Sequence, residues 1–326
     1  MGASYRGFAV RLMKHPGYDA VMTTIHTLDL DYRGRPESVA SYVLDAPDGP
    51  VMIETGPGVT TGALTDGLAR LGLTPADVRH VLVTHIHFDH AGAAGWMAQH
   101  GATVYVHEFG AKHLIDPSRL LSSAQRIYGD AMDELWGDII PIPERQVVPV
   151  HDDDALTLNG IELRAIETPG HARHHHAFAL ETDAGPIAFA GDAAGCYIAE
   201  APAFISLPTP PPEFDLTAWL ATLDRLDSGG FARIYPTHFG PVDDVAGHLD
   251  HVRSALEAHV AFVERHRDRP RDEVRDAYRA WFIAAAEREG VPAAKMGFYV
   301  KDSLADMNVT GILRYIEKRD QAVTSV

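Results

Sequence analysis

The chain has 326 residues, of which 46% are hydrophobic, a composition typical of a globular protein with one large domain and an addition. Its formal net charge of −17 argues against nucleic acid as a partner, because an acidic surface repels the phosphate backbone. The single cysteine, Cys196, excludes a disulfide within the chain, which suits a reducing cytoplasm.

The first 20 residues contain no apolar stretch of signal-peptide length. Nowhere does the sequence contain the run of about 18 apolar residues that a membrane-spanning helix needs. We therefore expect a cytoplasmic protein that has no membrane partner.

Short strands and helices alternate along most of the chain. Strands are predicted where β-branched and apolar residues are bounded by Gly, Pro or Asp, and helices where apolar residues recur on one face. Asn159-Gly160 is a strong signal for a two-residue hairpin turn. The predicted strands cover 21–32, 38–46, 50–56, 78–84, 102–108, 146–150, 155–167, 175–182, 186–191 and 231–240, and the predicted helices cover 60–73, 89–101, 216–226, 245–266, 271–289 and 308–319.

Two regions do not follow this alternation. Residues from about 111 to 145 have a helical pattern between two strands and hold Tyr128 and Trp136, so we interpret them as a helical excursion. After about residue 245 the strands stop. The sequence thus predicts an α/β domain over residues 1–245 and a helical C-terminal extension over residues 246–326.

The strand ending at Thr84 leads into an unusual stretch, "VLVTHIHFDHAG" (81–92), with three histidines and an aspartate in six positions. His85 and His87 are two apart, so in an extended segment they point the same way and can reach one ion. Asp89 and His90 begin the next turn and are displaced toward a second ion. This spacing indicates a metal site.

Three further polar residues follow the ends of apolar strands. They are His171 after a Pro-Gly turn, Asp192 and His238. Strand ends on one edge of a sheet can converge on one cleft, and imidazole with carboxylate suits zinc or iron. Two metals about 3.5–4 Å apart need a bridging ligand, and Asp192 is the natural bridge. The complete set predicted from the sequence is His85, His87, Asp89, His90, His171, Asp192 and His238.

The order His-x-His-x-Asp-His, followed by His, Asp and His over roughly 150 residues, resembles the metallo-β-lactamase superfamily in its glyoxalase II-like binuclear branch. The resemblance covers about residues 20–245. It implies an αββα sandwich with two metals at one edge between the sheets. It also implies that His85, His87 and His171 hold one metal, and that Asp89, His90 and His238 hold the other, with Asp192 between them.

The resemblance also indicates which branches of the superfamily this sequence does not match. True β-lactamases of the superfamily lack the bridging Asp, so Asp192 argues against antibiotic hydrolysis. Flavodiiron members carry Glu at the second motif histidine, and His87 argues against them. Relatives usually carry Asp at Glu54, and we expect this carboxylate to orient a ligand from outside the ligand set.

By this resemblance we expect a metal-dependent hydrolase with two divalent ions, zinc first and iron or manganese as alternatives. A hydroxide bridging the metals would attack a thioester, lactone or phosphoester. Asp192 would bridge the metals, and Asp89 would orient the hydroxide or carry its proton. The alternative is an oxidoreductase with one iron, similar to persulfide dioxygenases. We expect a small-molecule substrate and consider a homodimer.

The sequence does not decide the roles of several residues near the motifs. His174, His175 and His176 crowd one turn and are expected to support the ligands or the structure. Cys196 is either a pocket thiol or a small buried residue, and Tyr197 is a candidate for the substrate pocket.

Overall fold

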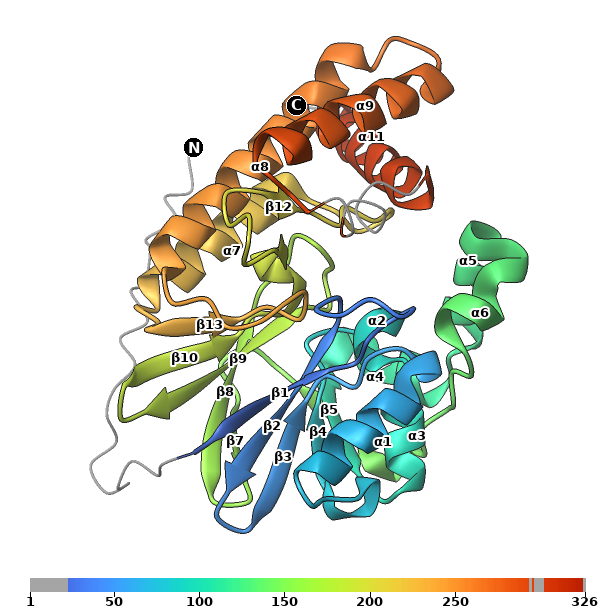
Figure 1. The fold of residues 1–326 in the computed structure, drawn as a ribbon. Coiled ribbons are helices and arrows are strands. Elements are labelled where there is room, and N and C mark those ends of the chain that lie inside the picture. Colours follow the sequence, from blue (N-terminus) through green and yellow to red (C-terminus); the bar gives the residue numbers. More distant parts are fainter. Residues whose placement is uncertain (1–22, 293–294, 296–301, 325–326) are drawn as a thin grey trace.

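The computed structural model describes residues 23–292, 295 and 302–324, and within them two β-sheets face each other with helices on both outer sides (Figure 1). The prediction about the N-terminal 20 residues falls outside this part of the chain, as do the first two residues of the strand predicted over 21–32. The predicted αββα sandwich with C-terminal helices is confirmed. No helix within the described ranges is both long enough and apolar enough to cross a membrane.

The first sheet has six strands in the order β1-β2-β3-β4-β5-β6. β1, β2 and β3 are antiparallel neighbours, whereas β3, β4, β5 and β6 run parallel, so their carboxyl ends meet at one edge. The strands are β1 (Ile25–Asp29), β2 (Ala40–Ala46), β3 (Gly49–Ile53), β4 (His80–Leu82), β5 (Thr103–His107) and β6 (Val147–Val150).

The second sheet has five strands in the order β13-β10-β9-β8-β7, in which only the β13–β10 pair is parallel. The turn between β7 and β8 has Asn159 at φ 47° and Gly160 at φ 83°, the backbone that a two-residue hairpin requires. The strands are β7 (Ala155–Leu158), β8 (Ile161–Glu167), β9 (His176–Thr182), β10 (Gly185–Phe189) and β13 (Arg233–Tyr235). A separate small pair joins β11 (Cys196–Tyr197) and β12 (Ile205–Ser206).

Buried apolar side chains between the two sheets hold the layers together. Tyr42, Phe178 and Phe189, for example, are essentially inaccessible to solvent and belong to one cluster that spans both sheets. Burial of apolar surface of this kind is the main favourable term in folding. It fixes the facing edges of the sheets relative to each other, and the strand-end loops therefore have defined positions.

Helices cover the outer face of each sheet. A first group packs against the six-stranded sheet, and α7 and α8 pack against the five-stranded sheet (Figure 1). The predicted helix over 89–101 is two short helices, because the backbone leaves the helical range at Ala93, which has φ −90° and ψ 5°. The α-helices are α1 (Thr61–Arg70), α2 (Phe88–Ala91), α3 (Ala94–Gln99), α4 (Glu108–Ile115), α5 (Ser118–Tyr128), α6 (Met132–Trp136), α7 (Leu216–Ser228), α8 (Val245–His266), α9 (Arg271–Arg288) and α11 (Asp302–Thr324).

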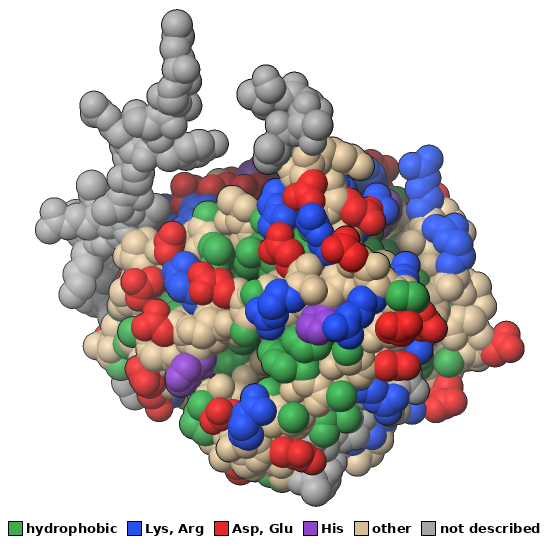
Figure 2. All heavy atoms as spheres, turned by 90° about the horizontal axis from the view of Figure 1, so that it is seen from above, with side chains coloured by type: hydrophobic (Ala, Val, Ile, Leu, Met, Phe, Trp, Pro, Cys, Tyr) green, Lys and Arg blue, Asp and Glu red, His purple; other side chains and the backbone are tan. Residues whose placement is uncertain are grey.

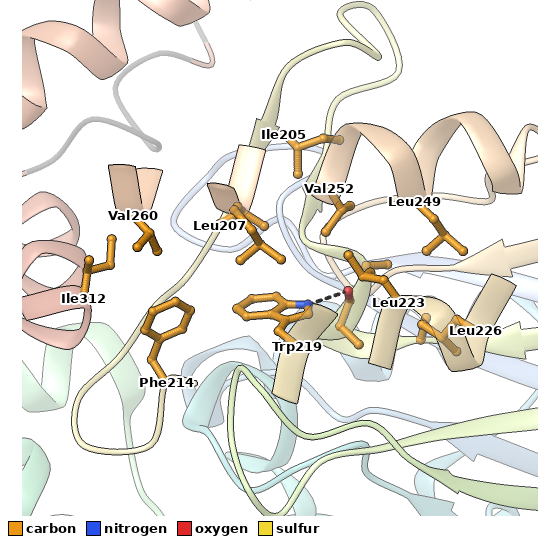
Figure 3. Packing of buried hydrophobic residues seen from close by; sticks show 14 of the residues in the cluster. Ile205, Leu207, Phe214, Trp219, Leu223, Leu226, Leu249, Val252, Val260 and Ile312 are labelled. Atoms are coloured by element: carbon orange, nitrogen blue, oxygen red, sulfur yellow. Dashed lines mark hydrogen bonds between the residues drawn. The ribbon is translucent and has the colours of Figure 1, made fainter. Parts of the chain in front are cut away.

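The C-terminal helices share a hydrophobic core with the second sheet. Figure 3 shows Trp219 of α7 among Leu207, Phe214 and Val260, with Ile312 of α11 beyond them. The indole N–H of Trp219 donates to the carbonyl oxygen of Ala193 at 3.0 Å, the dashed line in the figure. The proposed division at residue 245 therefore marks the end of the strand-containing segment rather than the border of a separate core.

The excursion forms α4, α5 and α6 between β5 and β6. Trp136 packs against Tyr32, Phe88 and Tyr128, with ring centroids 5.9, 5.7 and 5.3 Å away. The large aromatic residues of the excursion thus pack on the chain's own fold, beside the strand ends where the predicted ligands lie.

Candidate metal centre

All seven predicted ligands lie at one edge of the sandwich. The stretch carrying His85 to His90 follows β4, and His171 follows β8. Asp192 follows β10, and His238 follows β13. Each strand end delivers a polar side chain to the gap between the sheets, and the ligand atoms form overlapping groups, each within 4.8 Å.

The first group contains His85, His87 and His171. Nδ1 of His87 lies 2.9 Å from Nε2 of His85 and 2.8 Å from Nε2 of His171. One proton on His87 could serve only one of these contacts. A metal ion would accept the lone pairs of all three nitrogens at once.

The second group contains Asp89, His90 and His238. Nε2 of His238 lies 3.5 Å from Oδ2 of Asp89, and Nε2 of His90 lies 3.8 Å from Oδ1 of Asp89. Asp192 stands between the groups. Its Oδ2 is 3.3 Å from Nε2 of His171, and its Oδ1 is 3.2 Å from Nε2 of His90 and 3.4 Å from Nε2 of His238.

Outer hydrogen bonds fix which nitrogen of these rings carries the proton. Nδ1–H of His171 donates to the Pro208 carbonyl oxygen at 2.9 Å, and Nδ1–H of His238 donates to the Ser38 carbonyl oxygen at 2.7 Å. A carbonyl oxygen can only accept, so Nδ1 is protonated and Nε2 keeps its lone pair. In both rings that lone pair points at Asp192 and the group beside it, as a metal ligand requires.

Glu54, which is not a predicted ligand, orients several groups of the site through hydrogen bonds. Its Oε1 accepts from the Thr84 hydroxyl at 2.5 Å, from Nδ1 of His90 at 3.1 Å and from the Thr237 hydroxyl at 3.1 Å. Thr84 Oγ1 in turn lies 3.1 Å from Nδ1 of His85. Glu54 is fully buried and has a positive φ of 65°, so its backbone is held in an unfavourable conformation that aims the carboxylate at the site.

The three consecutive histidines have different surroundings. His175 holds the backbone of Asp192, whose N–H donates to Nε2 of His175 at 3.1 Å, while Nδ1 of His175 contacts Thr168 Oγ1 at 2.6 Å. His174 contacts Glu213 through Nε2 at 3.2 Å. His176 stacks on His107, with ring centroids 4.4 Å apart.

The surroundings shift the pKa values of the candidate ligands in different directions. Burial and, after it, neighbouring imidazoles lower the pKa of His85 well below its usual value and that of His87 to about 3. Burial also opposes charge on His90, but the carboxylates of Asp192 and Glu54 outweigh it and raise its pKa. Burial alone would raise the pKa of Asp192, yet His90, His171 and His238 bring it well below the usual value.

These donors fit bound metal ions. Nε2 of His90 and Oδ1 of Asp192 are fully buried and lie 3.2 Å apart, yet they make no hydrogen bond of acceptable geometry to each other or to another described residue. Buried polar atoms without partners are costly unless something else satisfies them. Neutral imidazoles and carboxylates, with no thiolate in the set, match a reactive metal site rather than a closed structural zinc site.

A cavity of about 360 Å³ opens onto the ligands. Its floor includes His87, Asp89 and Asp192. Its walls are mainly apolar and come from α2, α5, α6, α11 and the Pro-rich loop after β12. They include Phe88, Leu120, Ala124, Ile127, Tyr128, Leu135, Trp136, Pro208, Pro210, Pro211, Leu304 and Met307. The excursion and the C-terminal helices therefore form two walls of the same cavity.

Some residues of the site could not be recognised in the sequence. Thr84 and Thr237 directly precede the predicted ligands His85 and His238, but their hydroxyls carried no signal, and Glu213 is a single polar residue outside every motif. Cys196 is both a small buried residue and a thiol that lines the cavity, so the two interpretations of it are compatible. Burial raises the pKa of its thiol. Tyr197, a candidate for the substrate pocket, instead packs on His248, with ring centroids 5.2 Å apart.

Comparison with known proteins supports the same family. A metallo-β-lactamase fold-containing protein of Sulfurisphaera tokodaii is 28% identical over 194 residues, which cover 58% of this chain and 68% of the relative. An atrochrysone carboxyl ACP thioesterase of Aspergillus novofumigatus is 26% identical over 228 residues, or 67% of this chain and 56% of the relative. An N-acyl homoserine lactonase of a Bacillus species is 24% identical over 206 residues, or 56% of this chain and 71% of the relative.

The chain thus spans a little over half the length of the fungal thioesterase. Among solved structures, a metallo-β-lactamase family protein of Thermus thermophilus superposes with a TM-score of 0.66 at 25% identity, covering 91% of this chain and 94% of that one. The model of the metallo-β-lactamase superfamily matches residues 34–238, which include all seven candidate ligands. The chain belongs to the metallo-β-lactamase superfamily.

Proposed function

We propose that this protein is a binuclear metal-dependent hydrolase that acts on an acyl thioester or a lactone, with a phosphoester as the third choice. The observation that carries the proposal is the position of Asp192, whose two oxygens face His171 on one side and His90 and His238 on the other. A carboxylate so placed can join two ions held by the two groups.

The glyoxalase II-like branch and zinc as the native metal are part of this proposal. When bound, two divalent ions would lower the pKa of a water molecule and polarise the scissile carbonyl. His85, His87 and His171 would hold one ion, and the other would lie among Asp89, His90 and His238.

The chain's own residues have distinct parts in such a reaction. Asp192 fixes the spacing of the two groups and is held in place by His175. Asp89 lines the cavity with a side chain that is 28% exposed. Burial would raise the pKa of its carboxyl, but His90 and His238 outweigh burial and lower that pKa to about 2, so the group is ionised. We assign it to orient the attacking water and to hold its proton. The apolar walls exclude bulk water from the reacting carbonyl.

The cavity favours an acyl substrate over a phosphodiester. Among the described residues that line it, Arg33 is the only lysine or arginine, and its guanidinium lies 3.3 Å from Glu134. The negative charges of a polyanionic substrate would meet only one basic side chain there, whereas an apolar acyl chain would bury surface against α5 and α11. The names of the thioesterase and lactonase relatives support the same substrate classes.

The test begins with metal analysis of protein purified without added metal. The metal-loaded protein is then assayed on one acyl thioester, one N-acyl homoserine lactone and one phosphodiester, beside the chelator-stripped protein and an Asp192→Asn variant. Two metals per chain and carbonyl hydrolysis that is lost in both controls are expected. One iron per chain with sulfur-dependent oxygen uptake would overturn the proposal in favour of a dioxygenase.

A cytoplasmic location, a small-molecule substrate and a homodimer stay predictions. Light scattering coupled to size-exclusion chromatography measures the mass in solution and tests the homodimer directly.

A further inference from the structure

A second concavity, the basic groove, lies beside the cavity and outside the metal centre. Its volume is about 760 Å³, and it is formed between the start of α7, the turn around residue 170 and the last turns of α11. Its lysine and arginine side chains are Arg173, Arg314, Lys318 and Arg319, against the carboxylates of Glu213 and Asp215.

The charge of this groove departs from that of the whole chain, which carries a formal net charge of −17. Seen from above in Figure 2, basic and acidic side chains are interspersed over the helical layer, as expected where most charges have partners. Arg319 is paired with Glu264 at 2.6 Å, and Arg173 with Glu213 at 3.4 Å.

Arg314 and Lys318 differ from Arg173 and Arg319 because they have no ion-pair partner among the described residues. They are four residues apart on α11, so they project from the same face of the helix. Both are exposed, and no acidic side chain among the described residues lies within ion-pair distance of either. Among the described residues, Lys318 Nζ donates a hydrogen bond only to the Pro212 carbonyl oxygen, at 3.1 Å. Glu213 and Asp215 line the same groove, but neither forms an ion pair with these two cations.

The groove adjoins the cavity. Pro212 and Glu213 line both, so the two spaces lie on either side of one loop, and a single elongated ligand that runs over this loop would reach both. Such a ligand would have an apolar end in the cavity, a reactive carbonyl over the metal centre and an anionic end near Arg314 and Lys318.

We propose that the basic groove binds the phosphate-bearing nucleotide end of a coenzyme A thioester, the acyl group of which lies in the apolar cavity. This inference rests on the proposed hydrolase function and names its substrate class. Hydrolysis breaks the acyl C–S bond and forms a C–O bond with water. The products are a carboxylic acid and the thiol of coenzyme A, which takes up the proton that water releases.

The shape of the groove, its two cations and the adjoining cavity favour a coenzyme A thioester over other anionic ligands. A free phosphate or a sugar phosphate would satisfy the cations but would leave the adjoining acyl cavity empty. An acyl carrier protein has the same thioester arm, but it would dock on a broad surface, whereas the groove is concave and large enough for a nucleotide. Paired phosphates suit two cations about one helical turn apart.

The kinetic test compares octanoyl-coenzyme A with octanoyl-N-acetylcysteamine, which has the same thioester and no phosphate. Arg314→Gln, Lys318→Gln and the double variant are assayed on both. Arg70→Gln, an exposed arginine in the last turn of α1, is the matched control. We expect each groove substitution to lower kcat/KM for the coenzyme A thioester about tenfold, mainly through KM, since a charged contact is lost. The short thioester and the control should change less than about twofold.

A binding test needs no catalysis. Adenosine 3′,5′-bisphosphate is titrated into the protein by calorimetry, and it should bind the native chain and Arg70→Gln but not the double variant. Raising the salt concentration should weaken this binding.

The outcomes separate the two proposals. If both thioesters are hydrolysed equally well and the groove variants change neither, the inference is wrong while the hydrolase function stands. A carrier-protein thioester that is preferred over coenzyme A, with the same dependence on Arg314 and Lys318, also overturns the coenzyme A assignment. If no ester is hydrolysed but the nucleotide binds through these two residues, the groove is a nucleotide site and the proposed function fails.

Discussion

Glu54 accepts a hydrogen bond from Nδ1 of His90 at 3.1 Å, at a place where neither side chain has any exposed surface. A buried carboxylate is costly unless it is fully hydrogen-bonded, and Glu54 also accepts from Thr84 and Thr237. One residue outside the ligand set therefore orients groups from two separate segments of the chain, the stretch that follows β4 and the stretch that follows β13.

Glu54→Gln should weaken metal binding about 10- to 100-fold while leaving the fold intact, because the amide keeps the shape but loses the charge that orients His90. Competition with a chelating dye measures the affinity. Glu162→Gln, an exposed glutamate on β8, is the control. Unchanged metal affinity in Glu54→Gln would show that the carboxylate does not act on the ligands.

Asp192→Asn should lose at least one metal and nearly all hydrolase activity, because an amide cannot offer two charged oxygens to two ions. Elemental analysis gives the metal content, and Asp183→Asn, at an exposed position, is the control. A variant that still holds two tightly bound metals would refute the bridging role.

Acid should destabilise the fold through its buried neutral histidines. Burial lowers the pKa of His259 to about 3, and its Nδ1 contacts the Tyr278 hydroxyl at 2.7 Å. The unfolded chain takes up this proton near pH 6.5 and the folded chain does not. The contribution of His259 is therefore complete above about pH 6.5 and declines as the pH falls toward 3.

His259→Gln removes that titration. Denaturant unfolding in a chelating buffer should show that the variant loses about 2 kcal/mol less stability than the native chain between pH 7 and pH 5. Equal losses in the two proteins would mean that His259 does not stay neutral in the folded state.

Ile127 on α5 lines the cavity, although its side chain is half exposed. Ile127→Ser should reduce kcat/KM for an octanoyl ester several-fold more than for an acetyl ester, because the long chain loses apolar surface to bury. Phe109→Ser is the matched control, since Phe109 is equally exposed but does not line the cavity. Equal effects on both esters would place the acyl chain elsewhere.

A chain cut after residue 244 should be poorly soluble, even though every candidate ligand is retained. α8 contributes Val252, Leu256 and Val263 to the core cluster that covers the second sheet, and all three have no exposed surface. Their loss would uncover a large apolar face. Solubility and light scattering check this, and a soluble, monomeric, fully active fragment would contradict it.

The sequence by itself determined the class of fold and predicted seven candidate ligands, which the structure brings together at one edge of the sandwich. His85 to His90 are local, so their spacing alone places them in one loop, and the apolar runs before Asp192 and His238 predict strand ends. The hairpin at Asn159-Gly160 was also predictable, because its positive φ values are a property of two adjacent residues. Such features depend on short-range geometry.

Only the tertiary structure decided how the groups face one another. Thr237 and Glu213 reach the site from separate segments, and no local pattern distinguishes them from other polar residues. Glu54 was expected to orient a ligand only through the family resemblance, and its hydrogen-bond partners became known from the structure. The two walls of the cavity, from α5 and α11, are far apart in sequence and meet because burial of apolar surface brings both onto the sandwich. The orientation of Asp192 likewise depends on His175, a contact made across the sheet after folding rather than along the chain.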